Sequence, residues 1–337
     1  MSSWYHEMGS YQHQRMRKHP VQRKIPVVLI GGFLGSGKTT LANHVLAQPE
    51  EARTDVVVRE YGLVSIDDKL MRVDSVRVRT ISGATMHMEE QTLIYMVLDR
   101  LHDERYGKFD KLLLETSGTE NPEELLQLFF LWDMPYMYEL VSFIAVVDSE
   151  YGMLNLNEYR AAREQLGYAD VIVLNKTDCA SHEEIDELER RVRSINSAAS
   201  IVRTTYCQLS SHELGSRSLY EQLKALRETD SREGRIYMDP ISSIIIEEEL
   251  PLDKAKVNEW IQSLFEDYGS KILRSKGFFS FIGEDYRYEF QAVRKSFHSY
   301  AHDLWPDGEP RKSVIVLIGE DLPSQRELKQ SLEECAK

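Results

Sequence analysis

Short apolar runs alternate with helix-like segments through the first two thirds of the chain. From Ile25 onward, runs of strand length cover residues 27–30, 56–58, 112–114, 143–147 and 171–174. Helix start signals lie between them, with Asn121 before Pro122 in one case, and Ser181 three residues before Glu184 in another. This regular succession predicts an α/β domain with a mainly parallel sheet.

The pattern changes after a charged stretch at residues 227–235. Beyond it, apolar strand patterns lie close together at residues 244–246, 278–282, 286–290 and 314–318. One amphipathic helix and a helix that closes the chain accompany them. We therefore expect a mobile N-terminal tail (1–24), an α/β domain (25–226), a linker (227–240) and a smaller C-terminal α+β domain (241–337).

Composition narrows the class of protein. With 42% hydrophobic and 28% charged residues the chain is typical of a globular protein, and no apolar run approaches the roughly 20 residues of a membrane-spanning helix. No export signal is visible, and three cysteines without CxxC spacing fit a reducing compartment, so we expect a cytoplasmic protein without membrane contact. A net charge of -14 argues against nucleic acid as a partner.

The strongest motif is a glycine-rich loop that matches GxxxxGK[ST]. It follows the apolar run at residues 27–30 and precedes a helical pattern. Glycines let backbone amides approach phosphates closely, and we expect Lys38 to reach the β and γ phosphates and the Thr39 hydroxyl to hold Mg²⁺. The expected nucleotide-binding residues of this loop are Gly32, Leu34, Gly35, Ser36, Gly37, Lys38, Thr39 and Thr40.

Two further elements complete a predicted nucleotide site. Glu115 ends the run at 112–114, where its carboxylate would lie beside the metal, directly or through a water, and Gly118 could then approach the γ phosphate through its amide. Asn175, Lys176 and Asp178 belong to an NKTD sequence that follows the run at 171–174. An aspartate there can accept hydrogen bonds from two donors of guanine that adenine lacks. GTP is therefore favoured over ATP.

These motifs, in this order, resemble the CobW family of P-loop GTPases. The resemblance rests on Gly31 through Thr40, Glu60-Tyr61-Gly62, Glu115 through Gly118, Asp148, Gln165 through Asp178, and Arg274 through Phe278. It implies a metallochaperone or metalloenzyme-maturation GTPase that hydrolyses GTP slowly with Mg²⁺. The expected catalytic residues are Lys38, Glu60, Glu115 and Gly118.

The chain departs from the family at one hallmark. Where the family has a GCxCC metal motif, this sequence reads Gly83-Ala84-Thr85-Met86-His87, without a thiol. A thioether and one imidazole hold zinc less well than thiolates do. Two readings stay open: a weak site for Zn²⁺ or another transition metal built from Glu60, Met86 and His87, with Met88 as a further candidate ligand, or a switch segment without a metal.

The same departure leaves two functions open. In one, the protein carries metal to a client metalloprotein. In the other, it is a GTP-gated activator or assembly module for a client protein and has no high-affinity metal site. Acceleration of GTP hydrolysis by a partner or by a homodimer is an expectation that the sequence leaves undecided, as are the client and the role of the C-terminal domain.

Overall fold

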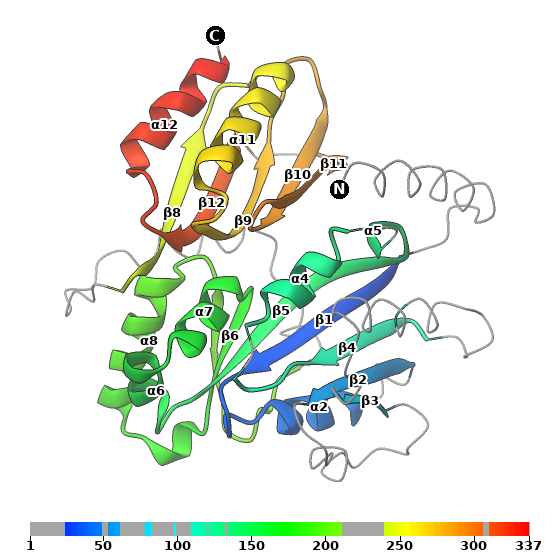
Figure 1. The fold of residues 1–337 in the computed structure, drawn as a ribbon, viewed down its shortest axis with the longest axis vertical. Helices are drawn as coiled ribbons and strands as arrows, with labels where there is room; N and C mark the ends of the chain where they lie inside the picture. Colours follow the sequence, from blue (N-terminus) through cyan, green and yellow to red (C-terminus); the bar gives the residue numbers. More distant parts are fainter. Residues whose placement is uncertain are drawn as a thin grey trace.

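The structure is a computed structural model that describes residues 24–48, 53–60, 78–82, 98, 109–119, 121–131, 134–210, 239–305 and 310–336. Within these residues it contains two sheets in two stacked domains (Figure 1). The predicted tail, apart from Lys24, and most of the predicted linker lie outside the described residues. No described helix is long and apolar enough to cross a membrane.

The N-terminal domain has a seven-stranded sheet in the order β3-β2-β4-β1-β5-β6-β7, and all six strand pairs are parallel. This confirms the predicted α/β class. The strands are β1 (Ile25–Gly32), β2 (Thr54–Glu60), β3 (Val78–Ser82), β4 (Lys111–Glu115), β5 (Tyr138–Asp148), β6 (Val171–Asn175) and β7 (Ser200–Arg203).

Helices cover both faces of this sheet because alternate strand residues point to opposite sides. Val28 and Ile30 pack toward α2 (Lys38–Leu46), whereas Val27 and Leu29 join a second cluster on the other face. The described helices of that second face are α4 (Glu123–Leu128), α5 (Met134–Met137), α6 (Gly152–Glu158), α7 (Arg160–Tyr168) and α8 (His182–Ile195).

The predicted helix starts are found with one shift. Ser181 and Glu184 form the expected capping box at α8. Asn121 accepts a hydrogen bond from the Glu123 amide at 2.9 Å, but α4 begins at Glu123, one residue later than Asn121 as N-cap would place it. A short 3-10 turn, η4 (Thr177–Cys179), follows β6.

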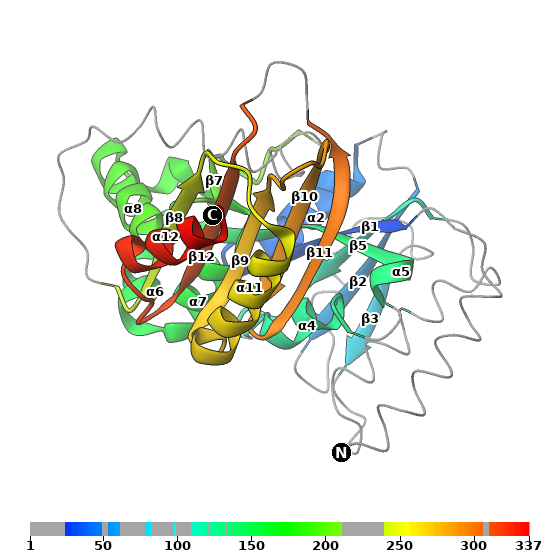
Figure 2. The same ribbon diagram turned by 90° about the horizontal axis from the view of Figure 1, so that it is seen from above.

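The C-terminal domain is a five-stranded antiparallel sheet with helices on one face, as an α+β domain requires. Figure 2 shows α11 (Lys254–Tyr268) and α12 (Gln325–Glu333) lying over its strands. In the order β11-β10-β9-β12-β8, the strands are β8 (Ile241–Glu248), β9 (Ile272–Phe279), β10 (Tyr286–Val293), β11 (Ser296–Leu304) and β12 (Ser313–Glu320). A final turn, η5 (Glu334–Ala336), ends the described chain.

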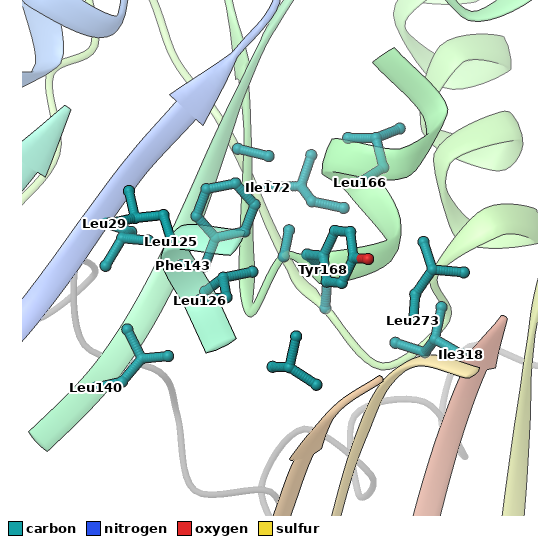
Figure 3. Close-up of a cluster of buried hydrophobic side chains, with 14 of the residues drawn as sticks. Leu29, Leu125, Leu126, Leu140, Phe143, Leu166, Tyr168, Ile172, Leu273 and Ile318 are labelled. Carbon is teal, nitrogen blue, oxygen red and sulfur yellow. The ribbon is translucent and has the colours of Figure 1, made fainter. Parts of the chain in front are cut away.

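The other face of the C-terminal sheet packs on the N-terminal domain. Along β12, Ile315 and Leu317 face α11 and α12, while Val316 and Ile318 join the same buried cluster as Leu166 of α7. Figure 3 shows Leu166 and Tyr168 of α7 near Leu273 and Ile318. The two domains therefore share one apolar core.

Candidate nucleotide site

The predicted site residues converge at the carboxyl ends of four neighbouring strands. Gly32 ends β1, Glu115 ends β4, Asp148 ends β5 and Asn175 ends β6. The register places Ile30 beside Glu115, and Asp148 beside Asn175. Because parallel strands end at one edge of the sheet, motifs far apart in the chain form a single site where ligands of open α/β sheets bind.

The loop from Gly32 to Lys38 has backbone conformations that require glycine. Gly35 and Gly37 have φ angles of 73° and 112°. A Cβ on Gly37 would lie 2.4 Å from the Asn175 Nδ2 atom, whereas nothing lies within 4 Å of one on Gly35. The second glycine is therefore needed both for its left-handed backbone and for the close approach of Asn175.

Lys38 is held over this loop by backbone carbonyls. Its Nζ donates to the Gly32 oxygen at 3.0 Å and to the Phe33 oxygen at 3.3 Å, and the residue is 9% exposed. An ammonium in this position lies beside the N-terminus of α2, and the first turn of a helix favours anions. The arrangement suits phosphate oxygens.

Thr39 and Glu115 form a pair of oxygen ligands. The Thr39 hydroxyl donates to the Glu115 Oε1 atom at 2.9 Å, and the glutamate is 1% exposed. Hydroxyl and carboxylate oxygens are the hard donors that Mg²⁺ prefers. The residues present therefore fit the magnesium ion that the sequence predicts, although Glu115 here accepts directly from the hydroxyl.

Asn175 ties the phosphate loop to the loop that follows β7. Its Nδ2 donates to the Ser36 carbonyl at 2.9 Å, and its Oδ1 accepts from the Cys207 amide at 2.9 Å. The Cys207 thiol in turn contacts the Gly37 oxygen at 3.4 Å. Since Asn175 is buried and bonded at both ends, it braces the two loops that would enclose a nucleotide.

Lys176 and Asp178 lie on the open side of the site. The Lys176 Nζ donates to the Asp148 Oδ2 atom at 2.7 Å, and this hydrogen bond raises the pKa of Lys176, which keeps the ammonium charged. Lys176 has a left-handed φ of 60°, and Asp178 follows in η4 with an exposed side chain. The Asp178 carboxylate is therefore accessible to the purine ring of a nucleotide.

Gly118 reaches the phosphate loop from the other side. A Cβ on this residue would lie 2.9 Å from the Leu34 backbone nitrogen, so only glycine allows the approach. The Gln165 side chain of α7 donates to the Gly118 carbonyl at 3.3 Å. Leu34 and Gly35 are exposed, as is Thr40.

The predicted transition-metal residues lie outside this description. Met86 and His87 are not among the described residues, and of Glu60 only the backbone at the end of β2 is described. Within the described part of the chain, no group of three His, Cys, Asp or Glu side chains could hold a metal ion.

The two cysteines nearest the predicted base site, Cys207 and Cys179, differ in burial. Cys207 is buried, and burial raises the pKa of its thiol to about 12, so it is a neutral thiol. Cys179 is exposed because η4 turns it away from the core.

The sequence alone indicated no role for Asp148, which accepts a hydrogen bond from Lys176. It also indicated none for Cys207, whose amide donates to Asn175. The place of Asp148, at the end of a predicted strand, was a usable signal. The hydrogen bond from the Cys207 amide to Asn175, 32 residues away, has no signal in the local sequence.

A P-loop nucleotide-binding protein is the class that this sheet and this loop define. Residues 26–203 match the CobW/HypB/UreG nucleotide-binding domain, and residues 241–336 match the C-terminal domain of the cobalamin synthesis protein CobW. The chain therefore belongs to the CobW family.

Its relatives include proteins named for zinc. It is 31% identical over 308 residues to the zinc chaperone YjiA of Escherichia coli (strain K12), covering 89% of this chain and 96% of that protein. It is 24% identical over 367 residues to zinc-regulated GTPase metalloprotein activator 1 of Saccharomyces cerevisiae, covering 93% and 83%. The crystal structure of Zn(II)-bound YjiA GTPase from E. coli is similar with a TM-score of 0.68 and 28% identity, covering 94% of this chain and all of that one.

Proposed function

We propose that this protein binds and hydrolyses GTP with Mg²⁺ and that the nucleotide controls delivery of a metal to a client protein. The observation that carries the proposal is the contact between Thr39 and Glu115, 76 residues apart, which joins the phosphate loop to the acidic strand end. The family assignment and the relatives named zinc chaperones support the link to metal.

The residues of the site have separate roles in this mechanism. Lys38 and the loop amides bind the β and γ phosphates and neutralise charge as it develops during transfer. Thr39 and Glu115 would hold Mg²⁺, which adds positive charge at the phosphates when bound. Gly118 faces the same region across Leu34. None of these side chains is a strong general base, so slow turnover follows.

Binding selectivity tests the nucleotide half of the proposal. Calorimetry with Mg²⁺ is expected to show heat from a GTP analogue and little from an ATP analogue. Asp178→Asn replaces an acceptor by a donor, so preference is expected to move from guanine toward xanthine, which carries a carbonyl in place of the exocyclic amine. Asp267→Asn, an exposed site on α11, is the matched control. Equal heats from both analogues in the wild type would rule out guanine recognition.

Hydrolysis is tested separately with a lysine pair. Lys38→Ala is expected to lower the rate of phosphate release by about 10²-fold or more, because a charge-stabilising donor is removed. Lys329→Ala, at an exposed position of α12, is expected to behave as the wild type. Phosphate release that survives Lys38→Ala would place the chemistry elsewhere.

A second candidate is a GTP-gated activator that carries no metal. The thiol-free sequence at residues 83–87 favours it. Titration of Zn²⁺ with and without a GTP analogue separates the two, with His87→Ala compared with His182→Ala, an exposed histidine at the start of α8. Nucleotide-dependent binding lost only in His87→Ala supports metal delivery, and no binding in any variant supports the activator.

A further inference from the structure

Two consecutive residues of α7 form hydrogen bonds with the segment between β4 and α4. Gln165 donates through Nε2 to the Gly118 carbonyl, and Glu164 accepts from the Asn121 Nδ2 atom at 3.2 Å. Both side chains are buried, and the Arg160 Nε atom holds Glu164 from within the same helix at 2.7 Å. The position of α7 therefore determines where the backbone at residue 118 lies.

Gly118 lies against the phosphate loop. The space for a Cβ on it is closed by the backbone nitrogen and Cα of Leu34, at 2.9 and 3.0 Å. The carbonyl that Gln165 holds belongs to the same residue, so this hydrogen bond fixes the peptide that leaves Gly118. A different orientation of that peptide would change the backbone that lies beside the phosphate loop, where the γ phosphate is expected to bind.

The same helix end is seated on the C-terminal sheet. A Cβ on Gly167 would lie 3.2 Å from Leu273 and 3.4 Å from Ile241, so α7 lies close against β9 and β8. Tyr168 adds a hydrogen bond from its hydroxyl to Glu123 Oε2 at 3.1 Å, and Arg294 of the C-terminal domain donates to the same oxygen at 2.9 Å. Figure 1 shows α7 and α4 between the two sheets.

We propose that Gln165 is a positioning residue that holds Gly118 against the phosphate loop, and that the C-terminal sheet, by seating α7, sets how strongly the protein distinguishes GTP from GDP. This inference rests on the proposed function. It gives the C-terminal domain a role in the nucleotide cycle: it supports the helix that carries the hydrogen-bond donor. Gln165 acts on the reaction only through Gly118.

The test removes the donor and keeps the length of the side chain. Gln165→Met is compared with Gln325→Met, because Gln325 also donates to a backbone carbonyl, that of Ile245, far from the site. Gln165→Leu, which also lacks the donor, is the second variant if the first does not fold; a cavity of about 20 Å³ borders Gln165. Two quantities are measured: amide hydrogen exchange at residues 116–119 without nucleotide, and the dissociation constants of GTPγS and GDP.

In Gln165→Met, exchange at residues 116–119 is expected to be about tenfold faster, in line with one lost hydrogen bond, while residues 36–41 keep the wild-type rate. The ratio of GDP to GTPγS dissociation constants is expected to fall about five- to tenfold with GDP affinity unchanged. A purely structural role would lower thermal stability and leave this ratio intact.

Unchanged exchange in both Gln165 variants, or an unchanged ratio with faster exchange, would overturn the inference. If the wild type bound neither nucleotide, the proposed function would fail and the role in discrimination would fail with it. Exchange, measured without nucleotide, would still show whether Gln165 anchors Gly118, so the two failures are told apart.

Discussion

The nucleotide edge and the domain interface both depend on buried polar groups, but they are built differently. At the nucleotide edge, side chains bind mostly backbone atoms: Lys38 donates to the Gly32 carbonyl and Asn175 to that of Ser36. At the interface, charged side chains bind each other. Lys276 lies 2.6 Å and Arg274 3.2 Å from the Asp170 carboxylate, and Asp170 also accepts from the Phe143 amide.

This difference explains why the phosphate loop can be built from a short motif, whereas the interface needs charged residues that are far apart in the chain. Backbone partners are present at every residue, so a short local sequence is enough to build the phosphate loop. The ion cluster needs residues 104 positions apart, on different domains, and its partners are specific. Asp170 immediately precedes β6 and Asn175 ends it, so the interface cluster and the predicted base site lie at opposite ends of the same strand.

The largest expected effect breaks the interface cluster. Asp170 is 4% exposed, and Asp170→Leu leaves the Arg274 and Lys276 cations without their carboxylate, which is expected to cost about 3–5 kcal/mol of unfolding free energy. Asp285→Leu is the control, since its pair with Arg311 is exposed and worth at most about 1 kcal/mol. Urea unfolding measures both, and similar losses would mean that burial gives the cluster no special weight.

Next comes the backbone of the phosphate loop. Gly37→Ala is expected to cost about 3 kcal/mol, from its left-handed φ and the contact with Asn175. Gly35→Ala is strained only by its left-handed φ angle, because no atom lies near the added Cβ, and is expected to cost about 1 kcal/mol. Thermal unfolding measures the difference. Equal costs would show that Asn175 moves aside without penalty.

Removal of the brace is a smaller change. Asn175→Ala leaves the Ser36 carbonyl and the Cys207 amide without their side-chain partner, at an expected cost of about 1–3 kcal/mol. Asn155→Ala, on α6, is the matched control. Chemical unfolding gives the cost and calorimetry with a GTP analogue gives the lost affinity; an affinity equal to that of the wild type would contradict the bracing role.

The smallest expected effect is in pH dependence. Burial acts to raise the pKa of Asp170, but Arg274 and Lys276 outweigh it and hold the pKa below its usual value. The stability that this carboxylate contributes is therefore present above its unfolded pKa of about 3.9 and is lost as the pH falls through the lower folded value. Asp170→Asn is expected to flatten the fall of stability in that acidic window, measured by urea unfolding, whereas Asp267→Asn keeps the wild-type slope.

Local patterns predicted five of the seven described strands of the parallel sheet, missing β3 and β7 at its two edges, and marked four of the five strands of the second domain. The loop ending at Thr39 and the Asn175 sequence were readable because each motif is contiguous. The run at 278–282 marked only the end of β9, which spans Ile272–Phe279, because Arg274 and Lys276 interrupt its apolar pattern. β11 was not predicted, since two polar residues separate Phe297 from Tyr300 and break the period-two apolar pattern of this edge strand. Charged residues that become buried because they pair across two domains cannot be recognised from the local sequence around either partner.

The two carbonyls that hold Lys38 have a consequence for how fast and how tightly a triphosphate can bind. A free lysine side chain has about 2 kcal/mol of rotamer entropy to lose on binding. Here two backbone carbonyls hold the ammonium, with Nζ within hydrogen-bond distance of both oxygens, so the protein itself supplies part of that ordering. An arriving phosphate exchanges one set of oxygen acceptors for another and leaves the chain around the ammonium where it is.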